Sequence, residues 1–409
     1  MAVGLPFVTS SSRSEYLGWP RITDLYAKAF PGLLTSRDNF VIAIDRDVLE
    51  ARMRMYFNAS VSDEEIAAAM PSAIADASRF DGAETRKTLV PRGFLPDKIV
   101  RYAYRPFDNR WLYWEPETKL LHEKRSEYFP HVGRGNLWIE ARQRQTMAHF
   151  DRGYVTGLLA DSFGAGCSSF FPARLNAEAA ATTLLDPIDG VLRSNLTPQS
   201  ASYLDVIGTG VDALFAHVVA ALHSSAYVDE NAGALRQDWP RIPLPATRDA
   251  LLASAELGRR VAALLDVEEP VDAVTTSSVC HELRPVGVLA SVSGRQLDPS
   301  AGDLAVTAGW GHAGQGGVTM PGRGRALERP FTGAEVAAFR EGLADLGLTY
   351  DQLTACLGGA CYDVYLNDVA YWRCVTEMAR RIAVILLLEP ALDANYERVK
   401  ADTYAWPAK

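Results

Sequence analysis

Apolar residues recur at helical spacing in three parts of the chain. The first set is Val211, Leu214, Phe215, Val218, Val219 and Leu222. The others are Leu257, Val261 and Leu264, and Ile382, Ile385 and Leu386. Spacing of three and four predicts amphipathic helices. Thr247 can cap the second helix, and Pro390 is expected to stop the third. His217 and His223 border the apolar face of the first helix, and we interpret both as structural side chains.

Helix starts are also marked by capping signals. Ser62–Glu65 and Thr332–Glu335 both fit the capping-box pattern, in which two residues satisfy each other's backbone N–H groups. The helix that begins at the first box must end or kink at Pro71. A further helix is predicted to start near Asp45 or Asp47, with a carboxylate as its N-cap.

Strand and turn signals replace the helical pattern between residues 100 and 138. Aromatic residues cluster there, interrupted by prolines and by Asp108-Asn109. Val41–Ile44 predicts a short buried strand. The prolines of Trp239–Pro245 require an extended strap between two helices. Helices and strands mix without strict β-α-β alternation, so the expected fold class is α+β with a helical C-terminal part.

The same pattern predicts three structural regions. Residues 1–45 are expected to form an N-terminal tail and connection. Residues 46–245 are expected to form an α+β unit that contains a mixed sheet, and residues 246–409 a helix-rich unit packed on it. A chain of 409 residues is long enough for more than one core.

The composition is that of an ordinary globular protein, with 48% hydrophobic and 22% charged residues. This excludes disordered and collagen-like classes. The longest apolar run, Ile382–Leu388, is far too short to span a membrane. The N-terminal residues lack the charged and apolar regions of a secretory signal, and five scattered cysteines suit a reducing compartment. We therefore expect a cytoplasmic protein with no membrane partner.

Sequence motifs for catalysis and cofactor binding are weak. Gly309–Gly314 matches the G-x-G-x-x-G pattern, but the glycines and the Pro321-Gly322 pair that follow disfavour the helix that a dinucleotide loop must open. A surface loop is the favoured interpretation. Cys356 and Cys361 lack a matching Cys or His pair, so free thiols are favoured over zinc. The nucleophile-elbow and phosphate-loop motifs are missing as well. We expect no cofactor, no metal and no catalytic residues.

One segment departs from the acidic average. The net charge is −9, which by itself argues against a polyanionic partner. Residues 86–144, however, contain thirteen Lys and Arg against seven Asp and Glu, a charge of +6. Basic residues interleaved with aromatic ones suit phosphate contact and base stacking. A solvated sheet face with local ion pairs, such as Arg105 with Asp108, explains the composition equally well.

Four motifs lie along nearly the whole chain. They are Pro31–Phe40 (PGLLTSRDNF), Tyr104–Tyr113 (YRPFDNRWLY), Leu222–Tyr227 with Trp239–Pro245 (LHSSAY and WPRIPLP), and Cys361–Asn367 with Tyr371–Trp372 and Ala379–Ile382. Together they resemble the C-terminal specificity region of type ISP restriction-modification enzymes and, more loosely, of adenine-N6 DNA methyltransferases. Family members usually carry a further block between the Tyr-Trp and Ala-Arg-Arg-Ile elements, which this chain lacks.

The resemblance implies a sequence-specific DNA target recognition module of a restriction-modification system that acts in phage defence. Its partners would be double-stranded DNA and a methyltransferase or helicase portion in cis or in trans. The candidate DNA-binding residues come from the basic segment: Arg101, Arg105, Asn109, Arg110, Lys124, Arg125, Arg142 and Arg144. Most motif residues are expected to be scaffold, with base readers in the variable stretches between them.

The alternative is a protein-interaction or regulatory module that retains the fold and has lost DNA reading. The charge of −9 and the missing C-terminal block favour this alternative. The arrangement of the basic residues discriminates between the two. Convergence on one concave face favours DNA recognition, and scatter favours the interaction module.

Overall fold

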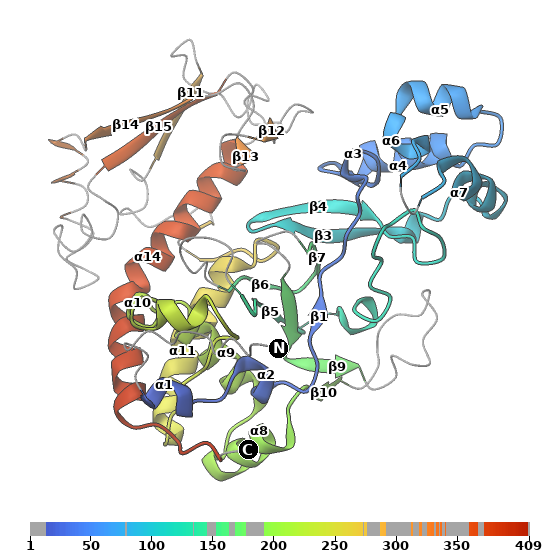
Figure 1. Cartoon of the computed structure of the whole chain (residues 1–409). Helices are drawn as coiled ribbons and strands as arrows, with labels where there is room; N and C mark the ends of the chain where they lie inside the picture. The colour runs from blue at the N-terminus through green and yellow to red at the C-terminus, as the bar shows by residue number, and fades with distance from the viewer. Residues whose placement is uncertain are drawn as a thin grey trace, which may run out of the picture. The chain divides into compact units, whose positions relative to one another are not determined.

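The structure is a computed structural model of the chain. It describes residues 14–77, 80–133, 135–144, 153–162, 168–176, 192–272, 274–275, 287–291, 312–313, 319–320, 325–330, 333–334, 336–337, 340, 360–366 and 372–407. The chain divides into two compact units (Figure 1). Unit 1 contains residues 1–268 and 391–409, and unit 2 contains residues 269–390. Helices and mixed sheets confirm the expected α+β class.

Unit 1 begins with short helices and strands. The helices are α1 (Ser14–Gly18), α2 (Ile22–Leu25), α3 (Asp38–Val41), α4 (Arg46–Tyr56), α5 (Asp63–Ala69), α6 (Pro71–Ile74) and α7 (Gly82–Leu89). The strands are β1 (Phe30–Pro31), β2 (Ile42–Ala43), β3 (Ile99–Arg105), β4 (Asp108–Tyr113), β5 (Trp138–Ala141), β6 (Val155–Thr156), β7 (Leu159–Ala160), β8 (Ser169–Pro172), β9 (Arg174–Asn176) and β10 (Leu192–Ser194). Short 3-10 turns lie at Val90–Arg92, Pro96–Lys98 and Phe129–His131.

Two four-stranded sheets contain eight of these strands, with the orders β2-β4-β3-β7 and β1-β8-β5-β6, and β9 pairs with β10. Strand β3 runs antiparallel to β4 and parallel to β7. Aromatic side chains fill the core beside them. The ring of Trp138 stacks on Tyr128 at 4.1 Å between centroids, and Trp114 stacks on Phe129 at 3.9 Å. The aromatic cluster that predicts strands therefore also supplies much of the core.

The second part of unit 1 is helical. Its elements are α8 (Pro198–Ile207), α9 (Val211–Leu222), α10 (Ser225–Leu235) and α11 (Arg248–Leu265). Helices α9 and α11 lie side by side (Figure 1). A Cβ atom added at Gly258 of α11 would lie 1.7 Å from the carbonyl oxygen of Ala216 on α9. Only glycine permits this approach.

No single helix among the described residues is both long enough and apolar enough to span a membrane. Helices α8 and α9 meet the length and composition test only as a pair, and the pair is bent by 100°. Eleven of the twelve residues of α9 are buried inside the protein.

Three of the four local signals at helix starts are confirmed. The Asp45 carboxylate caps α4 and accepts a hydrogen bond from the backbone N–H of residue 47 at 2.8 Å. Ser62 and Glu65 form the expected capping box of α5, which ends before Pro71. Thr247 caps α11. Each of these starts is decided by residues within one turn, which is why the sequence predicts them.

Two expectations for secondary structure are wrong in detail. Val41 ends helix α3, so the predicted strand is reduced to β2. The last helix, α14 (Trp372–Ala401), continues through Pro390. Leu392 and Val399, beyond the proline, are buried in unit 1. The packing of this last part stabilises the helix enough to outweigh the hydrogen bond that Pro390 cannot make.

The compact units have different bounds from the three regions expected. The limits after residues 45 and 245 both fall inside unit 1. The expected tail is held by the strap, because the N–H of Ile22 donates to the carbonyl of Pro240 at 2.9 Å. The Arg241 guanidinium donates in turn to the carbonyl of Trp19 at 2.7 Å. Trp19 and Ile22 are buried, so this segment belongs to the core of unit 1.

Unit 2 contains strands and the first part of α14. Its strands are β11 (Gly287–Ser291), β12 (His312–Ala313), β13 (Thr319–Met320), β14 (Arg325–Pro330) and β15 (Ala360–Leu366), with β15 between β11 and β14. The guanidinium of Arg381 donates to the carbonyl of Glu269 at 2.7 Å. Of the Gly309–Gly314 motif only residues 312 and 313 are described, as a strand. Cys356 and the box residues Thr332 and Glu335 lie outside the described residues.

Candidate nucleic-acid interface

The hairpin of β3 and β4 carries half of the candidate DNA-binding side chains. They are Arg101 and Arg105 on β3, and Asn109 and Arg110 on β4. The strand register places Arg101 opposite Trp111, and Ala103 opposite Asn109. Because side chains alternate along a strand, Arg101, Asn109 and Trp111 share one face, and Arg110 lies on the other.

The turn of this hairpin is fixed by the YRPFD motif. Phe107 has a φ of 61°, in the left-handed region that non-glycine residues seldom adopt. Its N–H donates to the hydroxyl of Tyr154 at 3.2 Å. That hydroxyl donates to the carbonyl of Leu265 at 3.1 Å, at the end of α11. The motif therefore anchors the hairpin to the helical part of unit 1.

Arg101 and Asn109 converge on one carboxylate, that of Glu268. The Arg101 Nε donates to Glu268 Oε2 at 3.0 Å, and its Nη2 donates to Oε1. Asn109 Nδ2 donates to Oε1 at 2.9 Å. The guanidinium also lies 5.0 Å from the ring centroid of Trp111. Partial burial would raise the pKa of Glu268, but the hydrogen bonds from Arg101 and Asn109 outweigh it and lower that pKa.

Tyr104 ties the other two arginines of the hairpin to the first motif. Its ring lies 4.1 Å from the Arg105 guanidinium and 4.2 Å from that of Arg110. Its hydroxyl donates to Asp38 Oδ2 at 2.9 Å, in the TSRDNF stretch. Burial and the charge of Asp38 raise the pKa of Tyr104 to about 12. These contacts join two of the family-like motifs to each other, as expected of scaffold residues.

The acid partners in this region differ from the pair expected. Arg105 forms its ion pair with Asp161 at 2.9 Å, and Asp108 pairs with Arg110 at 2.7 Å. Asp161 is buried and also accepts a hydrogen bond from Tyr102 at 2.8 Å. Local ion pairing is therefore present, but a long-range partner replaces the sequence neighbour of Arg105.

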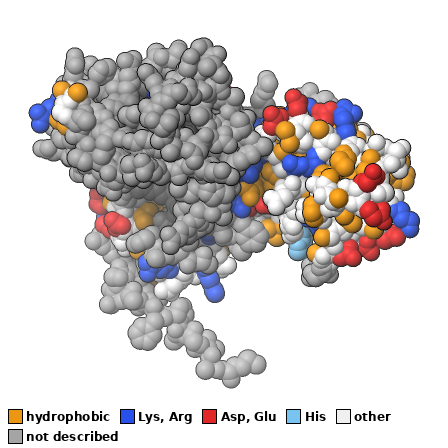
Figure 2. Space-filling view, turned by 90° about the horizontal axis from the view of Figure 1, so that it is seen from above, with side chains coloured by type: hydrophobic (Ala, Val, Ile, Leu, Met, Phe, Trp, Pro, Cys, Tyr) orange, Lys and Arg blue, Asp and Glu red, His pale blue; other side chains and the backbone are white. Residues whose placement is uncertain are grey.

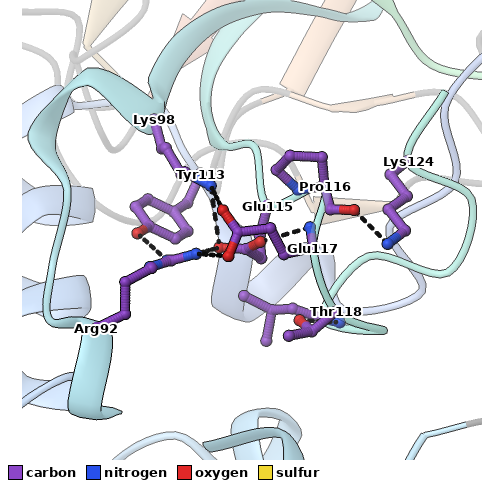
Figure 3. Close-up of polar contacts among 9 residues, drawn as sticks. Arg92, Lys98, Tyr113, Glu115, Pro116, Glu117, Thr118 and Lys124 are labelled. Carbon is purple, nitrogen blue, oxygen red and sulfur yellow. Dashed lines mark hydrogen bonds and ion pairs between the residues drawn. The ribbon is translucent and has the colours of Figure 1, made fainter. Parts of the chain in front are cut away.

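Lys124 and Arg125 are held by backbone carbonyls. The Lys124 ammonium donates to the carbonyl of Pro116 (Figure 3), and burial lowers its pKa. Arg125 has a φ of 51° and donates from Nε to the carbonyl of Gly32 at 2.9 Å. It also pairs with Glu123 at 3.4 Å. Both side chains thus contribute to the loop structure that follows β4.

Two further basic residues of the segment form ion pairs with a buried acid. Glu115 is fully buried, and Figure 3 shows Arg92 and Lys98 turned toward it and toward Glu117. Arg92 lies 2.5 Å from the Glu115 carboxylate, and Lys98 lies 3.5 Å from it. The hydrogen bond from Lys98 is the main reason that the pKa of Glu117 is lowered. This network is structural, since it satisfies a charge inside the protein.

Arg142 and Arg144 have different environments despite their closeness in sequence. Arg142 is 7% exposed and lies 3.4 Å from the Glu140 carboxylate, which is also buried. Arg144 is exposed and has no polar partner among the described residues. Of the eight candidate side chains, Arg144 is the exposed one, whereas Arg142 is buried and the other six are partly exposed.

The basic residues of 86–144 do not form one exposed patch among the described residues. Acids outside the segment pair with its side chains: Asp63, Glu84, Asp161 and Glu268. When these four acids are counted together with the segment, its net charge of +6 becomes +2. Figure 2 shows described acidic, basic and apolar side chains intermixed on the face viewed. Most of the local positive charge is thus neutralised within the fold.

Sequence reasoning missed these acid partners. Glu268 lies 167 positions from Arg101, and Asp161 lies outside the basic segment. No local pattern marks either residue as a partner, because the contact depends on how the hairpin meets β7 and the end of α11. Only the placement of Glu268 just after a predicted helix distinguishes it in the sequence.

The third motif is also scaffold. Ser224 caps α10 and donates its hydroxyl hydrogen to Asp393 Oδ1 at 2.7 Å. Asp393 lies on α14 and also accepts from the N–H of Ala226 at 3.0 Å. The Tyr227 hydroxyl donates to the carbonyl of Arg241 at 2.9 Å. The motif therefore connects α10, the strap and the C-terminal helix.

The structural interpretation of His217 and His223 is confirmed. His217 Nδ1 lies 2.7 Å from Ser254 Oγ, and Nε2 lies 2.7 Å from the carbonyl of Pro243. His223 Nδ1 lies 2.9 Å from the carbonyl of Val219. Across the described part of the chain, no group of three or more His, Cys, Asp or Glu side chains is arranged to hold a metal ion.

Comparison with known proteins places this chain in a family. The model of the Type ISP C-terminal specificity domain matches residues 24–287, which is more than half of the chain. The chain belongs to the Type ISP C-terminal specificity domain family. The matched range includes both four-stranded sheets of unit 1, the hairpin, and helices α8 to α11. No curated protein matches the chain.

Three solved structures of larger enzymes are similar to this specificity domain. The ATP-dependent Type ISP restriction-modification enzyme LlaBIII, bound to DNA, has a TM-score of 0.56 and 14% identity, over 95% of this chain and 25% of that chain. A nuclease-deletion mutant of the Type ISP enzyme LlaGI with a DNA substrate mimic has a TM-score of 0.49 and 16% identity, over 93% of this chain and 34% of that chain. A DrdV–DNA complex has a TM-score of 0.45 and 19% identity, over 66% of this chain and 27% of that chain. This chain thus spans about a quarter to a third of their lengths.

Proposed function

We propose that this specificity domain recognises a DNA target sequence for a Type ISP restriction-modification system. The match to the specificity-domain family over residues 24–287 is the observation that carries the proposal. The shared fold with LlaBIII, whose structure is that of an enzyme bound to DNA, is consistent with it. Arginine and asparagine side chains on a hairpin are suited to guanine and adenine edges and to phosphates.

Catalysis is assigned to other parts of the enzyme in this proposal. A methyltransferase or helicase portion, in cis or in trans, would modify or translocate the DNA, while this domain selects the site. An adenine-specific methyltransferase, a role in phage defence and a cytoplasmic location remain predictions from the resemblance. Because recognition would be shared with the partner, tethering supplies effective concentration that the domain alone lacks.

The interaction-module alternative also has a specific observation in its favour. Seven of the eight candidate side chains have polar partners within the chain, and four outside acids reduce the charge of the basic segment to +2. A domain of this kind has little excess positive charge for unspecific DNA binding. The two functions differ in one outcome, which is whether the domain dictates the DNA sequence that is modified.

The test is an exchange of the recognition part in the assembled enzyme. The domain is joined to or co-expressed with its methyltransferase, and methylated sites in the host DNA are mapped. Residues 80–268 are then replaced by those of a relative. The exchange extends to residue 268 so that Leu265 and Glu268, which contact the hairpin, travel with it. Methylation should move to the relative's sequence. If the methylated sequence does not change, the interaction module replaces the recognition domain.

A further inference from the structure

The face of the hairpin that carries Arg101 and Asn109 has the donor arrangement of an anion site. Three N–H groups from two neighbouring strands converge on the two carboxylate oxygens of Glu268. A guanidinium fork matches a phosphate as well as it matches a carboxylate, and a backbone phosphate of DNA carries the same single charge.

Arg101 is positioned independently of the acid it binds. Its guanidinium lies over the ring of Trp111, its cross-strand neighbour, and its Nη1 lies 3.4 Å from the carbonyl of Asn109. These contacts remain if Glu268 leaves. The fork therefore stays aimed at the same position, as a preformed anion site requires.

Glu268 is the acid partner on the hairpin that a ligand can displace. Its side chain is 31% exposed, whereas Asp161 is 4% exposed and Asp108 is 16% exposed. It follows the end of α11 in a turn, in which its N–H donates to Asp266 Oδ1 at 3.1 Å. Moving its side chain breaks no helix and no strand.

The closed arrangement also leaves a polar atom unsatisfied. Asn109 Oδ1 is buried and has no hydrogen-bond partner among the described residues, because its amide is oriented with the nitrogen toward Glu268. A buried acceptor without a donor is unfavourable. This unsatisfied acceptor makes the contact with Glu268 less favourable than its three hydrogen bonds alone suggest.

We propose that Arg101 and Asn109 form a binding site for a DNA backbone phosphate, which the Glu268 carboxylate occupies in the absence of DNA. This inference rests on the proposed function of DNA recognition. Glu268 acts as a built-in competitor, so only DNA held by further contacts displaces it. The acid thereby lowers unspecific binding and leaves specific binding possible.

The experiment compares two substitutions that remove the same charge. Glu268→Gln removes the competitor, and Glu256→Gln removes an exposed acid of α11 that pairs with Arg259, away from the hairpin. Binding of the full chain to a fluorescent mixed-sequence duplex is titrated over a range of salt concentrations. Glu268→Gln should tighten binding about tenfold at low salt and steepen the log–log salt dependence by about 0.9, as one new phosphate contact requires. Glu256→Gln should leave the salt dependence unchanged.

The double variant Arg101→Ala with Glu268→Gln identifies the site. It should bind no more tightly than the unmodified chain, because the gained contact is lost with the guanidinium. Thermal unfolding verifies that each variant is folded, and Glu268→Ala serves as a second version. Equal affinity and equal salt dependence of Glu268→Gln and Glu256→Gln would overturn the inference. In that case a methylation site that still moves on exchange of residues 80–268 retains the recognition function, whereas one that stays fixed removes both.

Discussion

His217 makes the stability of unit 1 dependent on pH. Its ring is 1% exposed and lies between α9, α11 and the strap. Nε2 must carry the proton, since it donates to the carbonyl of Pro243, and Nδ1 accepts from the hydroxyl of Ser254. That hydroxyl in turn accepts from Asn395 of α14 at 2.9 Å. One neutral imidazole thus joins four segments that are far apart in the sequence.

The magnitude follows from the pKa of His217. Burial lowers it from 6.5 to about 4, although the bond to Pro243 opposes the shift. In the unfolded chain the imidazole takes up a proton near pH 6.5, while the folded protein keeps it neutral. The contribution of neutral His217 to the free energy of unfolding is therefore fully present above pH 6.5 and is lost as pH falls toward 4. The loss is about 1.4 kcal/mol for each pH unit, or roughly 3 kcal/mol in all.

The assay is urea denaturation of the unmodified chain and of His217→Gln at several pH values. The variant cannot titrate, so its free energy of unfolding lacks this contribution, whereas His131 and the carboxylates affect both proteins alike. Above about pH 6.5 the difference between the two proteins should be constant. Below it, the advantage of the unmodified chain should shrink by about 1.4 kcal/mol per pH unit. Parallel profiles down to about pH 5 would refute a buried neutral His217.

Three further predictions concern packing, DNA contact and cofactors. Gly258→Ala should lower the free energy of unfolding by about 1–3 kcal/mol in urea denaturation, because the new Cβ would meet the Ala216 carbonyl. This loss should exceed the gain from the better helix propensity of alanine, and a neutral result would contradict the close helix contact. Arg144→Glu should weaken duplex binding across sequences and lower the slope of the log–log salt dependence by about 0.9. Arg142→Glu should mainly destabilise the fold, because Arg142 is buried. Unchanged binding of Arg144→Glu would place the DNA surface elsewhere. Calorimetry with S-adenosylmethionine should detect no complex, and a stoichiometric one would contradict the absence of a cofactor role.

The parts of the fold that the sequence predicts are those decided within a few residues. The helix over 211–222, the capping box at Ser62 and the extended strap before Thr247 follow from spacing, from caps and from proline geometry, which act locally. Pro390 shows the limit of that reasoning. Its effect on the helix is local, but Leu392 and Val399 are buried against distant segments, and the burial prevails.

The candidate site is less accessible to sequence reasoning, for an electrostatic reason. A residue count of 86–144 includes its thirteen basic side chains, but it omits the acids from other parts of the chain that pair with them in the folded protein. Arg142 and Arg144 look equivalent in sequence, although one is buried beside Glu140 and the other is exposed. A charge pattern alone therefore identifies the region and not the residues. Most described contacts of the first three family-like motifs join parts of the fold to one another, so the resemblance that they carry locates the fold more than the DNA contacts.

The neutralised hairpin suits a domain that must discriminate between DNA sequences. A protein with exposed, unpaired arginines binds any duplex, because phosphates are the same at every site. When each arginine already has an acid partner, contact with a phosphate only exchanges one anion for another and gains little. Binding then depends on contacts that differ between sequences, and the attraction common to all DNA is reduced. The intramolecular ion pairs of β3 and β4 are therefore compatible with recognition, and they favour selectivity over affinity.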